Sequence, residues 1–243
     1  MSDAPVRYSV DDGIATIAMD DGKRNALSPA MFRALNAALD RAESDRVPLV
    51  ITGANDVFSA GFDLKVMKAG GLDTLRMLGA GYAITARVLS HPYPVVAACN
   101  GHALAMGVFL MLSADYVIGT RGDFKISANE VALGLTMPRV AAAMLQHRLT
   151  PAAFQSAVTL SKYFATQAAL EVGFFDELVE PAELLPRARA RAKEFAELDM
   201  RAHAASKRRI RRSLVRRIRR SSPLDLLDAA RMGARAALGR GRR

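Results

Sequence analysis

Two short apolar runs constrain the fold most, because each is long enough for a buried strand and too short for a stable helix. They are PLVIT at residues 48–52 and PVVAAC at residues 94–99. Between them, apolar residues recur at helical spacing over residues 28–44, and residues 72–89 read as one long helix. Buried strands that alternate with helices are typical of an α/β fold with a largely buried sheet. The sequence therefore predicts this fold class.

Local signals add further elements. Asp12-Gly13 lies between apolar stretches at residues 6–10 and 14–19, and this pattern predicts a hairpin. Ser28 can cap the following helix, and Pro29 suits its first position. The remaining expected elements are strands at residues 116–119 and 174–179 and helices at 139–149, 151–161, 166–172 and 181–198.

Charge is divided unevenly along the chain, whose net charge is +10. Residues 1–200 hold 19 Lys and Arg against 22 Asp and Glu, whereas residues 201–243 hold 15 against 2. The high isoelectric point therefore reflects the end of the chain and does not mark the whole protein as a nucleic-acid binder. We expect a core domain at residues 1–200 and a basic helical segment at residues 201–243.

Hydropathy indicates a soluble cytoplasmic protein. No stretch approaches the roughly 18 apolar residues of a membrane-spanning helix. The first residues, Met1 to Tyr8, have the features of neither a signal peptide nor a transit peptide. The single cysteine, Cys99, lies in an apolar run and is expected to be a buried, reduced thiol.

Four motifs occur in order along the chain. They are Asn25-Ala26-Leu27, FSAGFDLK at residues 58–65, NGHALAMG at residues 100–107, and NEVALG at residues 129–134 followed by Pro138. In this order and spacing, over roughly residues 5–200, the chain resembles the enoyl-CoA hydratase/isomerase family, also called the crotonase superfamily. The resemblance implies a crotonase-like spiral of ββα turns with a C-terminal α-helical region that closes over the CoA site. It also implies a homotrimer or hexamer, an acyl-CoA substrate, and no metal or cofactor beyond the CoA of the substrate.

The resemblance further implies that two backbone amides bind the thioester oxygen and stabilise an enolate. The first falls on Phe62, after the glycine of the second motif, and the second on Met106 in the third motif. The chemistry requires rigid donors directed at the oxygen on which negative charge develops. A helix that begins near Met106 would supply such a donor, because the first amides of a helix have no internal partner.

Hydratases of this family use two glutamates, and only one is present here. One position falls on Phe109, which cannot carry a proton, and the other falls on Glu130. A single base is enough to move a double bond from the 3 to the 2 position, by removing a proton at C2 and returning it at C4. The pattern therefore favours an isomerase of 3-enoyl-CoA in fatty-acid metabolism, with Glu130 as the single acid and base. An enoyl-CoA hydratase is the alternative.

Contacts with the substrate follow from the same motifs. Backbone contacts from Ala60 to Leu64 need no particular side chain, whereas Arg24 and Lys65 are candidates for the CoA phosphates. The expected substrate-binding residues are Arg24, Ala26, Ala60, Phe62, Asp63, Leu64, Lys65, Met106 and Phe109. Asp63 and Asp115 match positions that have a structural role in the family. His102 is expected in the pocket wall or in a loop.

The basic segment contains KRRIRRSLVRRIRR at residues 207–220. Ile210, Leu214 and Ile218, with Val215, share one face at helical spacing, which predicts a basic amphipathic helix. A helix that covers the core is the favoured interpretation, followed by attraction of CoA phosphates. Binding of nucleic acid or an anionic membrane is less favoured. A crotonase-fold protein without enzymatic activity, acting through this segment, is the second hypothesis.

Overall fold

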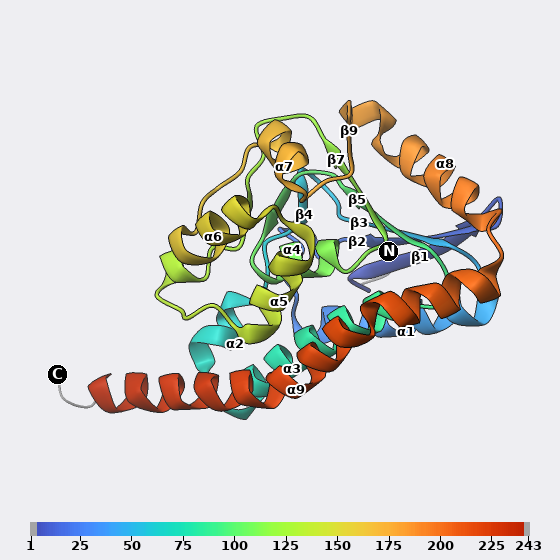
Figure 1. Cartoon of the computed structure of the whole chain (residues 1–243). Coiled ribbons are helices and arrows are strands. Elements are labelled where there is room, and N and C mark those ends of the chain that lie inside the picture. Colours follow the sequence, from blue (N-terminus) through green and yellow to red (C-terminus); the bar gives the residue numbers. More distant parts are fainter. Residues whose placement is uncertain (1–3, 241–243) are drawn as a thin grey trace.

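A six-stranded sheet forms the centre of the protein, and a computed structural model describes residues 4–240 (Figure 1). The strand order is β1-β2-β3-β5-β7-β9, in which β1 and β2 are antiparallel and every later pair is parallel. The strands are β1 (Val6–Asp11), β2 (Ile14–Met19), β3 (Leu49–Thr52), β5 (Val95–Cys99), β7 (Tyr116–Thr120) and β9 (Glu177–Val179). The predicted hairpin and the two predicted buried strands are confirmed.

A second, three-stranded parallel sheet is built from much shorter strands. These are β4 (Val57–Ser59), β6 (His102–Leu104) and β8 (Ile126–Ser127), in the order β4-β6-β8. Each of them follows one strand of the main sheet along the chain and precedes helical structure, so the ββα unit is used repeatedly. This arrangement confirms the expected α/β spiral. The second sheet was not predicted, because two or three residues cannot display the alternation that marks a strand.

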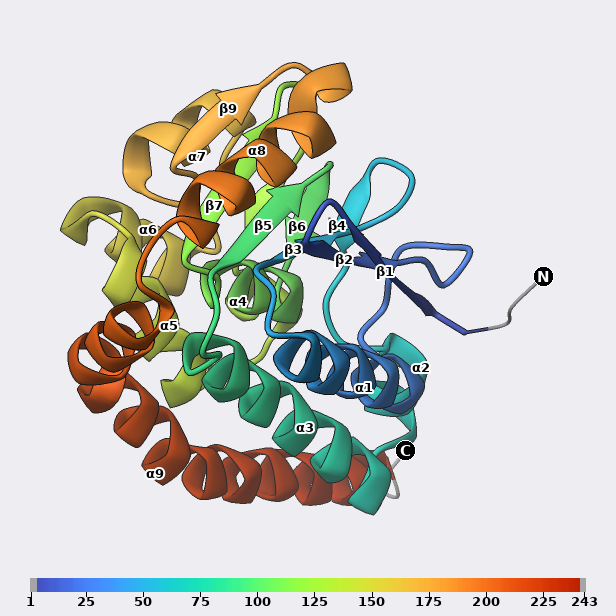
Figure 2. The ribbon, with the colours of Figure 1, turned by 90° about the vertical axis from the view of Figure 1, so that its right-hand side faces the viewer.

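Helices cover both faces of the main sheet (Figure 2). They are α1 (Pro29–Asp45), α2 (Leu64–Ala69), α3 (Gly71–Leu89), α4 (Met106–Leu112), α5 (Arg139–Arg148), α6 (Pro151–Leu160), α7 (Thr166–Val172), α8 (Leu184–Ala196) and α9 (Met200–Arg240), with short 3₁₀ helices at η1 (Val131–Leu133) and η2 (Pro181–Glu183). The α1 start is as predicted, since the Ser28 hydroxyl accepts from the Met31 amide and Pro29 is the first helical residue. The helix expected at 181–198 begins with η2 and continues as α8.

Residues of the buried strands alternate between two cores. In β3, Leu49 and Ile51 join the large core beneath α1, α3, α4 and α5, whereas Val50 joins a smaller core beneath α8. Because both faces are covered, the strands read as continuous apolar runs. Cys99 is a buried free thiol, as expected, and burial raises its pKa to about 12.

The long helix α9 packs along α3 and α5 (Figure 2). Leu214, Val215 and Ile218 are buried, as the helical spacing predicts. Ile210 was expected on the same face, but this prediction is wrong, because its side chain is 71% exposed. The inward stripe continues instead through Lys207 and Arg211, two cationic residues that the apolar pattern could not identify as buried.

Both buried cations bind Asp115. Its Oδ2 accepts hydrogen bonds from Lys207 Nζ at 2.6 Å and from the Val95 amide at 2.8 Å. Its Oδ1 lies 2.9 Å from Arg211 Nη1, and Arg211 also donates to the carbonyls of Leu89 and Ala114. Asp115 thus has the structural role that the sequence indicated. The cluster fastens α9 to the loop before β7.

Between residues 208 and 220, six exposed arginines of α9 have neither an ion pair nor a side-chain hydrogen bond among residues 4–235. They are Arg208, Arg209, Arg212, Arg216, Arg219 and Arg220. The packing of α9 agrees with a helix that covers the core. The division into domains at 1–200 and 201–243 stays a prediction. Within residues 4–240, no helix is both long enough and apolar enough to span a membrane.

Asp115→Ala should lower the free energy of unfolding by about 3–5 kcal/mol, because it leaves Lys207 and Arg211 buried without their counter-ion. Asp73→Ala is the matched control, since Asp73 forms an exposed pair with Arg76 and its loss should change stability by less than about 1 kcal/mol. Urea unfolding at constant pH measures both. Equal losses would contradict a special role for Asp115.

Candidate active site

A cavity of about 690 Å³ lies between the second sheet, α3, η1 and the end of α9. Its walls are mostly apolar, and the carboxyl group of Glu130 borders it from the start of η1. Expected site residues that border the cavity are Ala60, Phe62, Leu64, Phe109 and Glu130. The fold therefore gathers residues from three separate motifs around one space.

Close backbone contact brings the two candidate amide donors to one wall of this cavity. A Cβ atom added to Gly61 would lie 3.0 Å from Ala105 Cβ and 3.4 Å from the Met106 nitrogen. Gly61 also has a φ of +90°, which favours glycine. Phe62 follows Gly61 directly, and Met106 is the first residue of α4, where an amide has no partner within the helix. The two segments that carry the donors are therefore in contact.

Hydrogen bonds from the first motif hold the Gly61 turn. The Ser59 hydroxyl donates to the Asn25 carbonyl at 2.8 Å and accepts from the Gly61 amide at 3.1 Å. The Leu27 amide donates to the Gly61 carbonyl at 2.8 Å, and the Ala60 amide donates to the Arg24 carbonyl at 3.0 Å. The Asn25-Ala26-Leu27 motif therefore supports the first donor from behind.

Asp21 supports this loop in turn and was missed by the sequence analysis. Its two carboxylate oxygens accept from the amides of Lys23, Asn25 and Ala26 at 2.8–2.9 Å. The Asp-Gly pair at residues 21–22 was the available signal, because aspartate in a turn often accepts from amides a few residues later.

Helix α3 packs directly behind both donor residues at Gly81. A Cβ atom there would lie 2.6 Å from the Phe62 ring and 3.2 Å from Met106 Sδ. Glycine inside a helix costs about 0.5–1 kcal/mol relative to alanine. This contact explains why the predicted helix over residues 72–89 tolerates a glycine in its interior.

Ala105, the residue before the second donor, has an unusual backbone. Its φ is +48° and its ψ is −123°, in a region that is costly for a residue with a side chain. The Ala105 amide donates to the Ser127 carbonyl of β8 at 2.9 Å, which holds the strained turn in place. Strained residues of this kind concentrate at functional sites.

Glu130 is almost fully enclosed, with 7% of its surface exposed. No described residue lies within hydrogen-bond distance of its Oε2. Burial in the apolar site raises its pKa to about 7, because the charged form loses hydration. A carboxyl group of this kind can both accept and donate a proton near neutral pH.

Phe109 occupies α4 one turn after the second donor and is buried against the cavity.

Besides Glu130, two carboxylates border the cavity, Asp225 and Asp228 of α9. Asp225 accepts from Arg139 Nη1 and from the Val140 amide, each at 2.9 Å, and Asp228 binds Arg139 at 2.7 Å. Neither aspartate was expected at the site, because the motifs that indicated the site all lie before residue 139.

Five of the expected substrate-binding residues do not border the cavity. Met106 has a buried side chain, Arg24 and Lys65 are exposed, and Ala26 and Asp63 are half-buried. Asp63 caps α2 by accepting from the Lys65 amide at 2.7 Å, which agrees with a structural role. His102 lies on β6, where its Nδ1 accepts from the Lys125 amide, and does not form the pocket wall. Contacts of these residues with CoA stay predictions.

Comparison with known proteins gives a consistent family. The sequence profile of the enoyl-CoA hydratase/isomerase family matches residues 9–227. A probable enoyl-CoA hydratase, echA17 of Mycobacterium avium, is 32% identical over 208 residues, which are 82% of this chain and 78% of the relative.

Solved structures agree. The probable enoyl-CoA hydratase ECHA3 of Mycobacterium tuberculosis is 46% identical, covers 96% of this chain and 98% of its own, and superposes with a TM-score of 0.90. A second structure of that protein, called an enoyl-CoA isomerase, has a TM-score of 0.88 at 46% identity and covers 92% of this chain and 98% of its own. With the ββα spiral and the motifs on its cavity, this chain belongs to the enoyl-CoA hydratase/isomerase family.

Proposed function

We propose that this protein isomerises 3-enoyl-CoA to 2-enoyl-CoA with Glu130 as its single acid and base. One observation carries the proposal. Of the three carboxylates at the cavity, Asp225 and Asp228 are bound to Arg139, whereas Glu130 keeps an oxygen without a partner among the described residues. Phe109 also borders the cavity, and the family resemblance assigns a second catalytic glutamate to its position.

The amides of Phe62 and Met106 would donate to the thioester carbonyl oxygen. Negative charge develops there when a proton leaves C2, so these donors stabilise the enolate more than the substrate. The Gly61 contact and the bonds from Ser59 fix the amides before the substrate arrives. No side chain is needed for this step.

Glu130 would then move one proton in two steps. Its carboxylate takes a proton from C2, and the electron pair left on carbon delocalises into a dienolate that ends on the thioester oxygen. The protonated Glu130 returns the proton at C4, the double bond settles between C2 and C3, and the carboxylate is regenerated. A pKa of about 7 suits both roles.

Hydration of 2-enoyl-CoA is the main alternative reaction. The names of the relatives do not decide between isomerisation and hydration. The same Mycobacterium tuberculosis protein is called both a probable hydratase and an isomerase. The side chain of Phe109 favours isomerisation, because an apolar wall offers no group to activate water. A non-enzymatic role for the arginine face of α9 is the remaining alternative.

Assembly as a homotrimer or hexamer and a cytoplasmic location stay predictions.

Glu130→Gln should lower kcat for 3-enoyl-CoA isomerisation by about 10²–10⁴, the usual contribution of a general acid-base group. Glu171→Gln, which changes an exposed glutamate on α7, should keep full activity. Absorbance of the conjugated thioester follows isomerisation, and its loss follows hydration. Hydration that survives Glu130→Gln would remove Glu130 from the role of base. No turnover of either substrate, with salt-sensitive binding to polynucleotide or anionic vesicles, would support the non-enzymatic alternative.

The pH dependence should follow the ionisation of Glu130. The base acts when ionised, so kcat/KM should rise through pH 7 and level off above it. Below pH 7, kcat/KM should fall about tenfold for each pH unit. A flat profile between pH 5 and 8 would contradict this assignment.

Stability gives a second reading of the same group. In the folded protein the pKa of Glu130 is about 7, whereas in the unfolded chain it has the ordinary value of a glutamate, 4.5. At a pH between these two values the folded protein therefore binds more protons than the unfolded chain. The contribution of Glu130 to the free energy of unfolding should therefore be greatest at low pH, where Glu130 is protonated in both states. It should fall as the pH rises toward about 7. Glu130→Gln should raise the free energy of unfolding at pH 8 by about 1–3 kcal/mol.

Gly61→Ala should disturb the first donor. The new Cβ would meet Ala105 Cβ and the Leu104 carbonyl oxygen at 3.0 Å, so the two segments must separate. We expect a loss of about 10²–10³ in kcat, as for removal of one oxyanion donor. Gly70→Ala is the control, because Gly70 also has a positive φ but has open space around its Cβ position. Similar losses in both variants would show that only backbone strain matters.

A further inference from the structure

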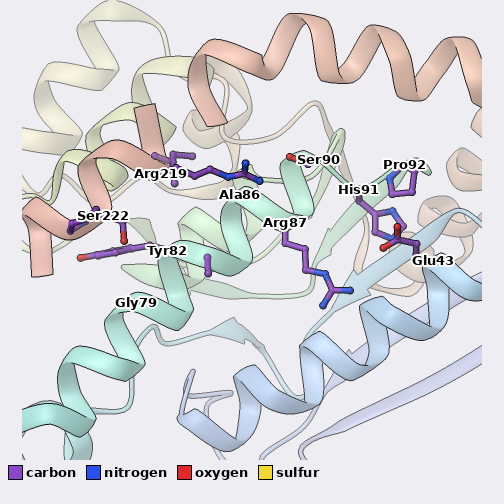
Figure 3. A pocket seen from close by; sticks show the side chains of 13 residues that line it. Glu43, Gly79, Tyr82, Ala86, Arg87, Ser90, His91, Pro92, Arg219 and Ser222 are labelled. Carbon is purple, nitrogen blue, oxygen red and sulfur yellow. The ribbon is translucent and has the colours of Figure 1, made fainter. Parts of the chain in front are cut away.

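Tyr82 of α3 borders both the active-site cavity and a second hollow. A groove of about 520 Å³ lies between α3 and α9, and Tyr82 lines it together with residues of both helices (Figure 3). Tyr82 is the only described residue that borders both the cavity and the groove. Its side chain is nearly buried, with 4% of the residue exposed.

The Tyr82 ring reaches from α3 toward the part of α9 that carries Ser222 (Figure 3). Burial raises the pKa of its hydroxyl well above the usual value, and the charges of Asp225 and Glu130 raise it further. Both carboxylates belong to the cavity, so the phenol lies within electrostatic reach of the reacting region. The ring is therefore part of the cavity wall on the α9 side.

Small residues of both helices border the groove. Gly79, Ala83 and Ala86 come from α3, and Ser222 and Pro223 come from α9. Pro223 lies inside α9 and has no N–H to donate to the helix, yet the helix continues past it. Arg219 of α9 lies beside Ala86 in the same groove (Figure 3). Arg87, also in the groove lining, is paired with Asp40. The groove is thus bordered here mainly by small side chains, with Ile218 and Arg219 of α9 beside them.

We propose that Tyr82 ends the acyl cavity and thereby limits the length of the acyl chain that this protein accepts. The α3–α9 groove is the space into which a longer chain would extend if the ring were smaller. Apolar walls on the cavity side suit an unbranched hydrocarbon tail. The inference rests on the proposed function, since it names the substrate class of the same site.

Tyr82→Leu and Tyr82→Ala test the proposal with 3-enoyl-CoA substrates graded from hexenoyl to hexadecenoyl. The ratio of kcat/KM for the longest to the shortest substrate should rise by at least about tenfold, because each added methylene in an apolar pocket contributes that much or more. Tyr82→Phe keeps the ring and is the matched control, with an unchanged ratio. A second control, Tyr82→Ala with Ser222→Phe, refills the groove from α9 and should restore the original ratio.

Binding separates this inference from the proposed reaction. Calorimetry with saturated acyl-CoAs of the same lengths requires no turnover. If no variant isomerises any substrate but Tyr82→Leu binds long saturated acyl-CoAs about tenfold more tightly relative to short ones, the length limit stands and the isomerase assignment fails. An unchanged length profile in folded Tyr82→Leu, in both assays, overturns the role of Tyr82. An equal shift in Tyr82→Phe overturns it as well. Tyr82→Leu keeps the test available if thermal unfolding shows that Tyr82→Ala is not folded.

Discussion

The backbone contact between Gly61 and the Ala105-Met106 turn is the constraint on which the site depends. Each segment follows one short strand of the second sheet, so that sheet aligns the two segments. Hydrogen bonds from Ser59 and the Leu27 amide hold one segment, and a bond to Ser127 holds the other. The donors are main-chain atoms, so their chemistry is largely independent of side-chain identity. The neighbouring residues Gly61 and Ala105 must be small mainly because the two segments approach so closely.

Specific chemistry comes from the side chains that face these donors. Glu130 supplies a carboxyl group whose pKa is raised by burial, and Phe109 supplies apolar surface where a second carboxyl would favour water addition. The two α9 carboxylates, Asp225 and Asp228, are both bound to Arg139. Three carboxylates thus border one cavity; two of them are bound to Arg139, and Glu130 keeps an oxygen without a partner among the described residues.

Motifs and apolar runs predicted much of this architecture. The main strands and most helices could be found because each leaves a local signal, and the motifs that carry Phe62, Met106 and Glu130 could be located by their residues. The second sheet could not be found, since its strands are shorter than any pattern. Lys207 and Arg211 were missed because burial of a cation depends on Asp115, far away in the sequence. Asp225 was missed for the same reason, because its partners Arg139 and Val140 lie on α5.

The placement of α9 has a consequence for how the protein matures. Residues 225–235, at the far end of this helix, form one wall of the cavity. During synthesis the two donor segments and Glu130 leave the ribosome well before this wall exists. An acyl-CoA that met the nascent chain would find an open, hydrated surface in place of an enclosed pocket. The cavity is therefore enclosed only once this part of α9 has packed against the rest of the protein.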